Sequence, residues 1–76
     1  MKELIEFIAK KLVDHPDDVD VREVESEEGQ LLELRVNPED MGKIIGKSGR
    51  TAKAIRTVVS SAAAKADAHV NLQIVE

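Results

Sequence analysis

The hydrophobic positions near the start of the chain repeat with the period of a helix. One face of this helix would carry Leu4, Ile5, Ile8 and Leu12. Pro16 ends the pattern, because proline cannot continue a helix. Phe7, the only aromatic residue of the chain, lies beside this face, and we expect it to belong to the core rather than to stack on bases. The pattern predicts an amphipathic first helix.

Two segments of alternating polarity follow this helix. Val19 and Val21 alternate with acidic residues and Val24 then breaks the phase, which predicts a strand with a bulge or an early end. Residues 27–30 have the composition of a turn. A second strand is predicted by the alternating apolar residues Leu32, Leu34 and Val36. The short connection between the two strands favours an antiparallel hairpin.

The second half of the chain predicts two helices and a last strand. Asn37 and Pro38 have the residue types that begin a helix, and Gly46 is placed to end it. Ser48 is expected to cap a further helix, whose buried side would consist of Ala52, Ile55, Val59, Ala62 and Ala66. The last strand would bury Ala68, Val70, Leu72 and Ile74 and expose the polar residues between them.

These elements predict an α+β fold in the order α-β-β-α-α-β. The last strand follows a long helical crossover, so it should run parallel to the second strand if the two are neighbours. Apolar positions on one side of each strand indicate a three-stranded mixed sheet with three helices on one face. A chain of 76 residues has room for one domain.

The distribution of charge differs from the net charge. The whole chain carries −4, yet residues 41–57 contain five basic residues and no acidic one, a local charge of +5. These five are Lys43, Lys47, Arg50, Lys53 and Arg56. The other residues, with 6 basic and 15 acidic side chains, carry −9. A basic segment on an acidic body fits a polyanionic partner, although charge alone fits a solvated helix face better.

The composition argues against catalysis and against membrane insertion. There is no cysteine, and His15 and His69 stand apart from each other and from any nucleophile. Ser60 and Ser61 occur in an alanine-rich helix without a nearby base. We therefore expect no catalytic residue, no metal ligand and no cofactor. The absence of a leader and of a membrane-length apolar run predicts a cytoplasmic protein without a membrane partner.

The glycine-rich segment 42–50 invites three interpretations as a phosphate-binding loop. A P-loop needs four residues between its first glycine and Gly-Lys-Ser, whereas Gly42 and Gly46 enclose only three. A dinucleotide fingerprint needs Gly-x-Gly, but position 44 is isoleucine, and the segment follows a helix instead of a strand. The third interpretation is a Gly-x-x-Gly turn between two helices, which clamps a single-stranded nucleic-acid backbone.

The third interpretation has a physical basis. Gly46 and Gly49 allow a sharp turn and close approach of sugar and phosphate, and the following helix offers free N–H groups to an anion. Lys47 adds a point charge, and Arg50 can donate two hydrogen bonds to one phosphate. The alternatives are an ordinary helix-turn-helix connection and a DNA-reading helix-turn-helix, which the three strands disfavour.

Residues 44–55, with the sequence Ile-Ile-Gly-Lys-Ser-Gly-Arg-Thr-Ala-Lys-Ala-Ile, resemble the core motif of KH domains. The order of elements is similar to the type II KH fold of bacteria. Segments 1–4, 22–25, 38–43 and 70–76 extend the resemblance to small stand-alone bacterial KH proteins, so that residues 1–76 are identified as a single KH domain with its loop at 46–49.

The resemblance implies a groove that holds about four nucleotides of single-stranded RNA with low sequence specificity. The implied RNA-binding residues are Gly46, Lys47, Ser48, Gly49, Lys43, Arg50, Lys53 and Ile45. Which of Ile44 and Ile45 lines the groove is left open by the sequence. Ala52 replaces a larger aliphatic residue of the general KH pattern, and segment 66–69 is not basic as in relatives, so weaker binding is expected.

The resemblance also implies partners and a cellular role. Proteins of this kind associate with themselves or with a larger Jag-like protein that contains a KH domain, so we expect a homodimer, a heterodimer or both. The role implied is that of an RNA chaperone or post-transcriptional regulator. The alternative is a protein-interaction or dimerisation module in which the Gly-x-x-Gly turn is vestigial.

Overall fold

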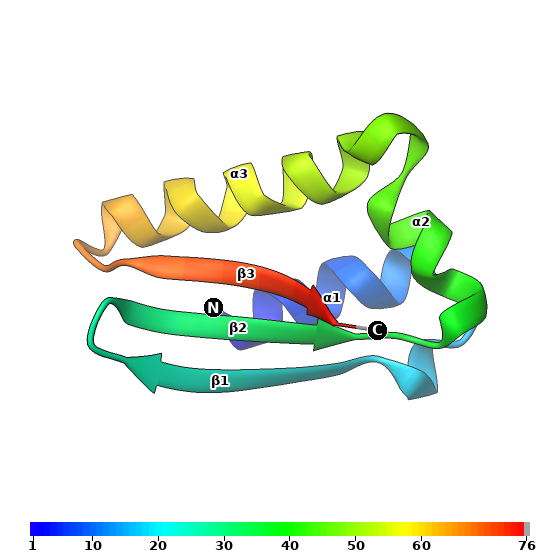
Figure 1. Ribbon diagram of the computed structural model, residues 1–76, viewed down its shortest axis with the longest axis horizontal. Coiled ribbons are helices and arrows are strands. Elements are labelled where there is room, and N and C mark those ends of the chain that lie inside the picture. The colour runs from blue at the N-terminus through cyan, green and yellow to red at the C-terminus, as the bar shows by residue number, and fades with distance from the viewer. Residues whose placement is uncertain (76) are drawn as a thin grey trace.

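The helices and strands follow the predicted order in the computed structural model, which describes residues 1–75 (Figure 1). Glu76, the last residue of the predicted domain, lies outside the described residues. The main elements are α1 (Lys2–Leu12), β1 (Asp20–Ser26), β2 (Gly29–Arg35), α2 (Met41–Ile45), α3 (Arg50–Lys65) and β3 (Val70–Val75). Single 3-10 turns at Pro16–Asp18, Pro38–Asp40 and Lys47–Gly49 connect them. The predicted α+β class is confirmed.

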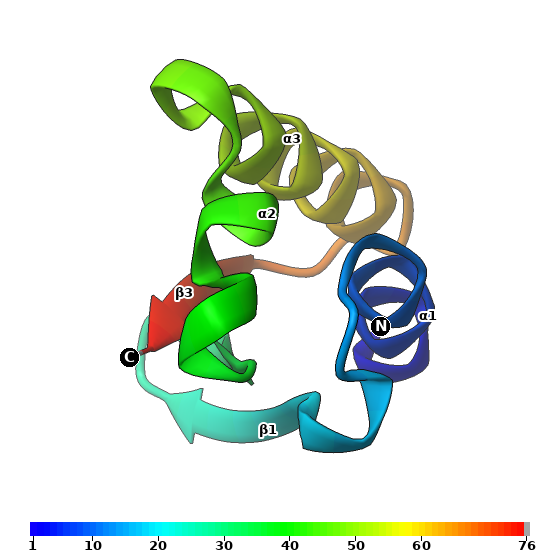
Figure 2. The same ribbon diagram turned by 90° about the vertical axis from the view of Figure 1, so that its right-hand side faces the viewer.

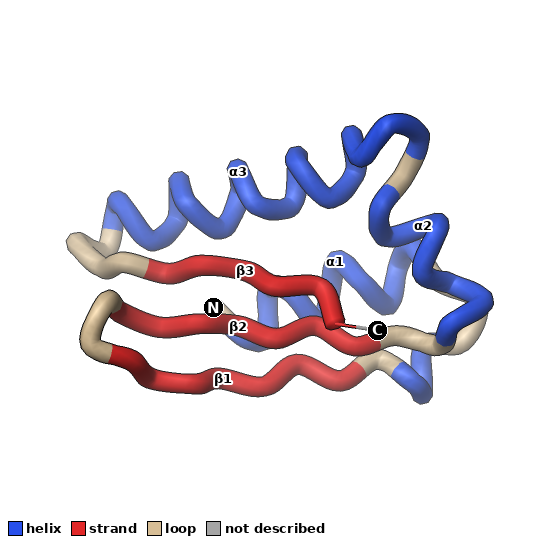
Figure 3. Tube along the Cα trace, in the orientation of Figure 1, coloured by secondary structure: helices blue, strands red, loops and turns tan. Residues whose placement is uncertain are grey.

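The sheet has the strand order β1-β2-β3, with β2 in the centre (Figure 3). Strands β1 and β2 form an antiparallel hairpin, and β3 runs parallel to β2, as predicted for a strand that follows a helical crossover. The prediction of a bulge or an early end in β1 is wrong, because its seven residues pair with β2 in unbroken register and the strand continues past Val24 to Ser26. Val24 lies opposite Leu31 and is 42% exposed, since this face of the sheet carries no helix.

The helices cover one face of the sheet, as the pattern of apolar positions predicted (Figure 2). The most deeply buried side chains of the core are Ile5, Leu32, Leu34, Ile44 and Val59, which come from all three helices and the central strand. The prediction that Phe7 belongs to the core is wrong, because its side chain is 62% exposed. Helix α1 buries Ile5 and Ala9, and Phe7 lies about 200° around the helix from Ile5.

Helix α3 buries Ala52, Ile55 and Val59 as predicted. Farther along, the buried residue is Ala63, whereas Ala62 is only half-buried. Ala66 and Ala68 are exposed, because α3 ends at Lys65 and β3 begins only at Val70. Within residues 1–75, no helix is both long enough and apolar enough to cross a membrane.

Candidate nucleic-acid interface

The chain enters α2 through a capped turn. The Asn37 side-chain oxygen accepts a hydrogen bond from the Glu39 N–H at 2.8 Å, and Pro38 occupies the first position of the turn, as predicted. Asp40, at the end of this turn, is 1% exposed. It accepts hydrogen bonds from the backbone N–H groups of Asp14 at 3.2 Å and His15 at 2.9 Å. The start of α2 is thereby attached to the segment that follows α1.

The His15 side chain completes this attachment, with its Nδ1 3.0 Å from an Asp40 carboxylate oxygen. The hydrogen bond to Asp40 raises the pKa of His15 above its usual value. Burial alone would raise the pKa of Asp40, but hydrogen bonds from the His15 side chain and from the Asp14 and His15 N–H groups outweigh burial and lower it. No local pattern predicts this pair, because 25 residues separate its members.

Gly46 ends α2, as predicted, in a conformation that requires glycine. Its φ of 76° and ψ of 175° lie in a region that L-residues essentially do not occupy. Its N–H donates to the Gly42 carbonyl at 2.8 Å. A Cβ at this position would lie 2.2 Å from Thr51 Oγ1 and 2.9 Å from the Thr51 backbone nitrogen. The end of α2 and the start of α3 can therefore lie this close together only because Gly46 has no side chain.

The tip of the turn is Lys47–Gly49. Ser48 has a φ of 57° and Gly49 a φ of 74°, so two consecutive residues are left-handed. The prediction that Ser48 caps α3 is wrong, because Gly49 occupies the cap position and no side chain donates or accepts there. Gly49 has no side chain to satisfy the first N–H groups of α3. The Arg50 N–H donates to the Lys47 carbonyl within the turn, and the positive end of the α3 dipole favours an anion placed beside the turn.

The two isoleucines before the turn have different environments. Ile44 is 0% exposed and belongs to the core, whereas Ile45 is 39% exposed. The structure thus resolves the alternative that the sequence left open: Ile45 is the accessible one of the pair. An exposed isoleucine beside a glycine turn provides an apolar surface on which a base can rest.

The basic residues divide into two groups. Lys47, Arg50 and Lys53 are exposed at the turn and at the start of α3. Lys43 forms an ion pair with Asp14, which raises the pKa of the Lys43 ammonium. Because Lys43 lies about 200° around α2 from Ile45, its side chain is on the side of α2 away from Ile45. Lys43 is therefore the predicted site residue that the structure separates from the others.

Arg56 was part of the basic segment but not of the predicted site. One turn beyond Lys53, its Nε donates to the carbonyl oxygen of Leu72 at 3.4 Å. This bond joins α3 to the outer edge of β3, which has no strand beside it. The i, i+3 spacing of Lys53 and Arg56 was the signal in the sequence that placed them on the same side of α3.

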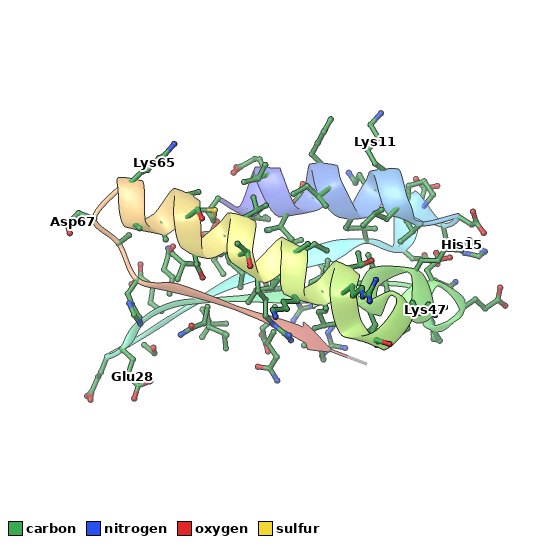
Figure 4. All side chains as sticks on the ribbon, turned by 90° about the horizontal axis from the view of Figure 1, so that it is seen from above. Lys11, His15, Glu28, Lys47, Lys65 and Asp67 are labelled. Carbon is green, nitrogen blue, oxygen red and sulfur yellow. The ribbon has the colours of Figure 1, made fainter. Side chains whose placement is uncertain are left out.

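The predicted residues other than Lys43 come together at one end of the molecule. In Figure 4, Lys47 lies at the start of α3, and Lys65 and Asp67 lie at its far end. The surface around the turn combines a glycine backbone, the positive end of the α3 dipole, three exposed cations and Ile45. Within residues 1–75, the structure contains no group of three His, Cys, Asp or Glu side chains able to hold a metal ion. Such a surface is suited to holding an extended polyanion with bases.

Comparison with known proteins gives consistent results. The family model described as "KhpA/KhpB, KH domain" matches residues 2–74. The "RNA-binding protein KhpA" of Clostridium perfringens is 63% identical over 75 residues, which cover 99% of this chain and 100% of the relative. The proteins of the same name from Halalkalibacterium halodurans and Aquifex aeolicus are 55% and 45% identical over 76 residues, with 100% and 96% of their lengths covered. A comparison with solved structures found no match.

Proposed function

The chain belongs to the KhpA/KhpB family of KH domains, and from this membership we propose that it binds single-stranded RNA. It is a binding protein and not an enzyme, like the relatives whose printed name is RNA-binding protein. The observation that carries the proposal beyond the family name is the turn at residues 46–49, where Lys47 and Ser48 are exposed and a Cβ at Gly49 would meet no atom within 4 Å. A second backbone can therefore approach the tip of this turn closely.

About four nucleotides would lie along the turn. Backbone atoms of Gly46, Lys47, Ser48 and Gly49 would contact sugar and phosphate, and the positive end of the α3 dipole would favour one phosphate at the start of α3. Arg50 and Lys53 would contact the neighbouring phosphates. Ile45 would support a base. Lys43 would contribute least, because Asp14 already neutralises it.

Sequence preference at the turn should be weak. Side chains that stack on bases are usually aromatic, and the one aromatic residue of this chain, Phe7, lies on α1 beside Lys11, whose Nζ is 5.5 Å from the ring centroid. Backbone and charge contacts act on any sequence alike. This combination suits an RNA chaperone or a post-transcriptional regulator in the cytoplasm, which acts on many transcripts.

Self-association and pairing with a larger KH-containing protein are part of the proposal. The family model covers both KhpA and KhpB, and exposed apolar side chains on α1 and α3 supply a surface that a partner can cover. Sedimentation of the chain over a range of concentrations measures self-association directly. A strictly monomeric chain at all concentrations would contradict this part of the proposal.

Fluorescence anisotropy with a labelled single-stranded RNA tests the main proposal. If Lys47, Arg50 and Lys53 neutralise about three phosphates, the logarithm of the binding constant should fall with the logarithm of the salt concentration with a slope of about −2. A slope near zero would contradict electrostatic binding at this turn. The same titration with duplex RNA should give much weaker binding, because the groove holds splayed bases.

A further inference from the structure

A hollow lies between the second half of α3 and the start of β3. It has a volume of about 190 Å³ and is lined by Ser60, Ala63 and Ala64 from α3 and by residues 68–71. Pockets for drug-sized ligands are larger, about 300 Å³ or more. The hollow therefore suits one small planar group and not a whole cofactor.

The hollow continues the row of side chains that begins at the turn. Lys53, Arg56, Ser60 and Ala64 follow one another at spacings of three and four residues, so they lie on one side of α3. Ser60 is ten residues beyond Arg50, about 15 Å along the helix. A single-stranded RNA whose phosphates contact Arg50 and Lys53 along this side of α3 would therefore extend toward the hollow.

The chemistry of the lining selects a base over a phosphate. None of its residues is a lysine, arginine, aspartate or glutamate. Ala63, Ala64, Ala68 and Val70 provide an apolar bed, and Ser60 provides a hydroxyl group from α3. Because Val70 and Leu72 are buried against the helices, the alternating side chain of Asn71 points to the other face of the sheet, away from α3. An anion would gain little in such surroundings, whereas a neutral ring with polar edges is matched by them.

The edge of β3 adds backbone groups to this surface. The His69 carbonyl accepts from Gln30 N–H of β2 at 2.9 Å, so the peptide groups of His69 face β2 and those of Val70 face the opposite way. The bond from Arg56 to the Leu72 carbonyl fits the same alternation. Val70 thus presents one N–H and one C=O at the unpaired edge, next to the hollow.

We infer that this hollow is a separate site for one unpaired nucleobase of the bound RNA, beyond the nucleotides held at the glycine turn. The Ser60 hydroxyl group and the Val70 N–H and C=O groups would distinguish one base from another. The inference rests on the proposed RNA binding. It places base discrimination in a protein whose turn contacts mainly the backbone.

The test compares RNAs of two lengths on matched variants. Ser60→Leu narrows the hollow, whereas Ser61→Leu changes the same residue type about 100° around the helix, outside the lining. Both serines are exposed, so both variants should keep the wild-type circular dichroism spectrum. Ala64→Leu, also exposed, narrows the hollow from a second position. Each protein is titrated with a four-nucleotide and an eight-nucleotide single-stranded RNA.

Ser60→Leu and Ala64→Leu should weaken binding of the longer RNA about tenfold, the size of one stacked base, and leave the shorter RNA unaffected. Ser61→Leu should bind both like wild type. Equal affinity of the longer RNA for all four proteins overturns the inference and leaves the proposed function intact. If the wild-type protein binds neither RNA, the proposed function itself fails and the inference with it. A loss of both RNAs in the two hollow variants alone would also overturn it, since the hollow would then not be separate from the turn.

Discussion

The three glycines around the turn should respond very differently to the same substitution by alanine. Gly42 is exposed inside α2, and a Cβ there would meet no atom within 4 Å. Gly49 has a φ of 74° and equally open surroundings. Gly46 has both a positive φ and a steric conflict with Thr51. The series therefore separates backbone entropy, backbone strain and overlap.

The magnitudes follow from these surroundings. Gly42→Ala should raise the free energy of unfolding by about 0.5 kcal/mol, because alanine is favoured in a helix. Gly49→Ala should lower it by about 1 kcal/mol, the cost of a left-handed alanine. Gly46→Ala should lower it by about 3 kcal/mol or more. Its φ and ψ suit only glycine, and a Cβ would lie 2.9 Å from the Thr51 backbone nitrogen, so that α3 must shift.

Urea unfolding followed by far-ultraviolet circular dichroism measures all three values. A domain of this size has a stability of about 4–11 kcal/mol, so even Gly46→Ala should leave a measurable folded population. The double variant Gly46→Ala with Thr51→Ser is a useful second variant. It removes only the γ-methyl group of residue 51, so the overlap between the new Cβ and the backbone nitrogen of residue 51 remains. If Gly46→Ala lowers the free energy of unfolding by no more than Gly49→Ala does, the end of α2 and the start of α3 do not lie as close together as described.

Two further predictions concern the contacts of α2. Because the pKa of Asp40 is lowered, its contribution to stability is present above the usual carboxyl pKa of 3.8 and is lost as the pH falls below that value. Because the pKa of His15 is raised, its contribution to stability is full below pH 6.5 and is lost as the pH rises through the higher pKa of the folded state. Stability measured by urea unfolding should therefore peak between these values, and His15→Gln should remove the alkaline decline while His69→Gln keeps it. Lys43→Ala should weaken RNA binding by less than about twofold, whereas Lys53→Ala should weaken it several-fold and reduce the salt slope by about 0.7. Equal losses of affinity in the two variants would show that the ion pair with Asp14 does not keep Lys43 from contacting RNA.

The sequence predicted the order of elements and the place of the turn because these depend on local signals. Asn37 and Pro38 begin a turn and Gly46 ends α2, since each acts through its own backbone or its nearest neighbours. The parallel direction of β3 followed from the long crossover, which allows few alternatives.

The errors concern properties that depend on the arrangement of neighbours. The position of Phe7 beside an apolar stripe did not reveal that α1 is covered only on its Ile5 and Ala9 side. Val24 indicated a bulge only on the assumption that every strand valine is buried, and one face of this sheet has no helix. The capping role expected of Ser48 failed because the left-handed turn continues through Gly49.

The candidate site was predictable as a motif but not as a geometry. Spacing, the position between two helices and the basic flanks together pointed to Gly46 and Gly49, yet only the structure separates buried Ile44 from exposed Ile45. Likewise, only the structure shows Lys43 beside Asp14, 29 residues away in the sequence. Contacts between residues so far apart in the sequence depend on how the elements pack, and local composition does not predict them.

The most direct test of the account is RNA binding by the double variant Lys47→Asp and Ser48→Asp. Both residues are exposed at the tip of the turn, so the variant should keep its circular dichroism spectrum and its self-association. The matched control is Ser61→Asp with Lys65→Asp, which makes the same change of charge in exposed positions toward the other end of α3.

In fluorescence anisotropy with single-stranded RNA, the turn variant should lose detectable binding, because two carboxylates would face the phosphates at the positive end of α3. With the four-nucleotide RNA, which is held at the turn alone, the control should bind within about threefold of wild type, because its new charges lie toward the other end of α3. RNA binding by the turn variant equal to that of the control would contradict the central claim, and would favour a protein-interaction module in which the turn is vestigial.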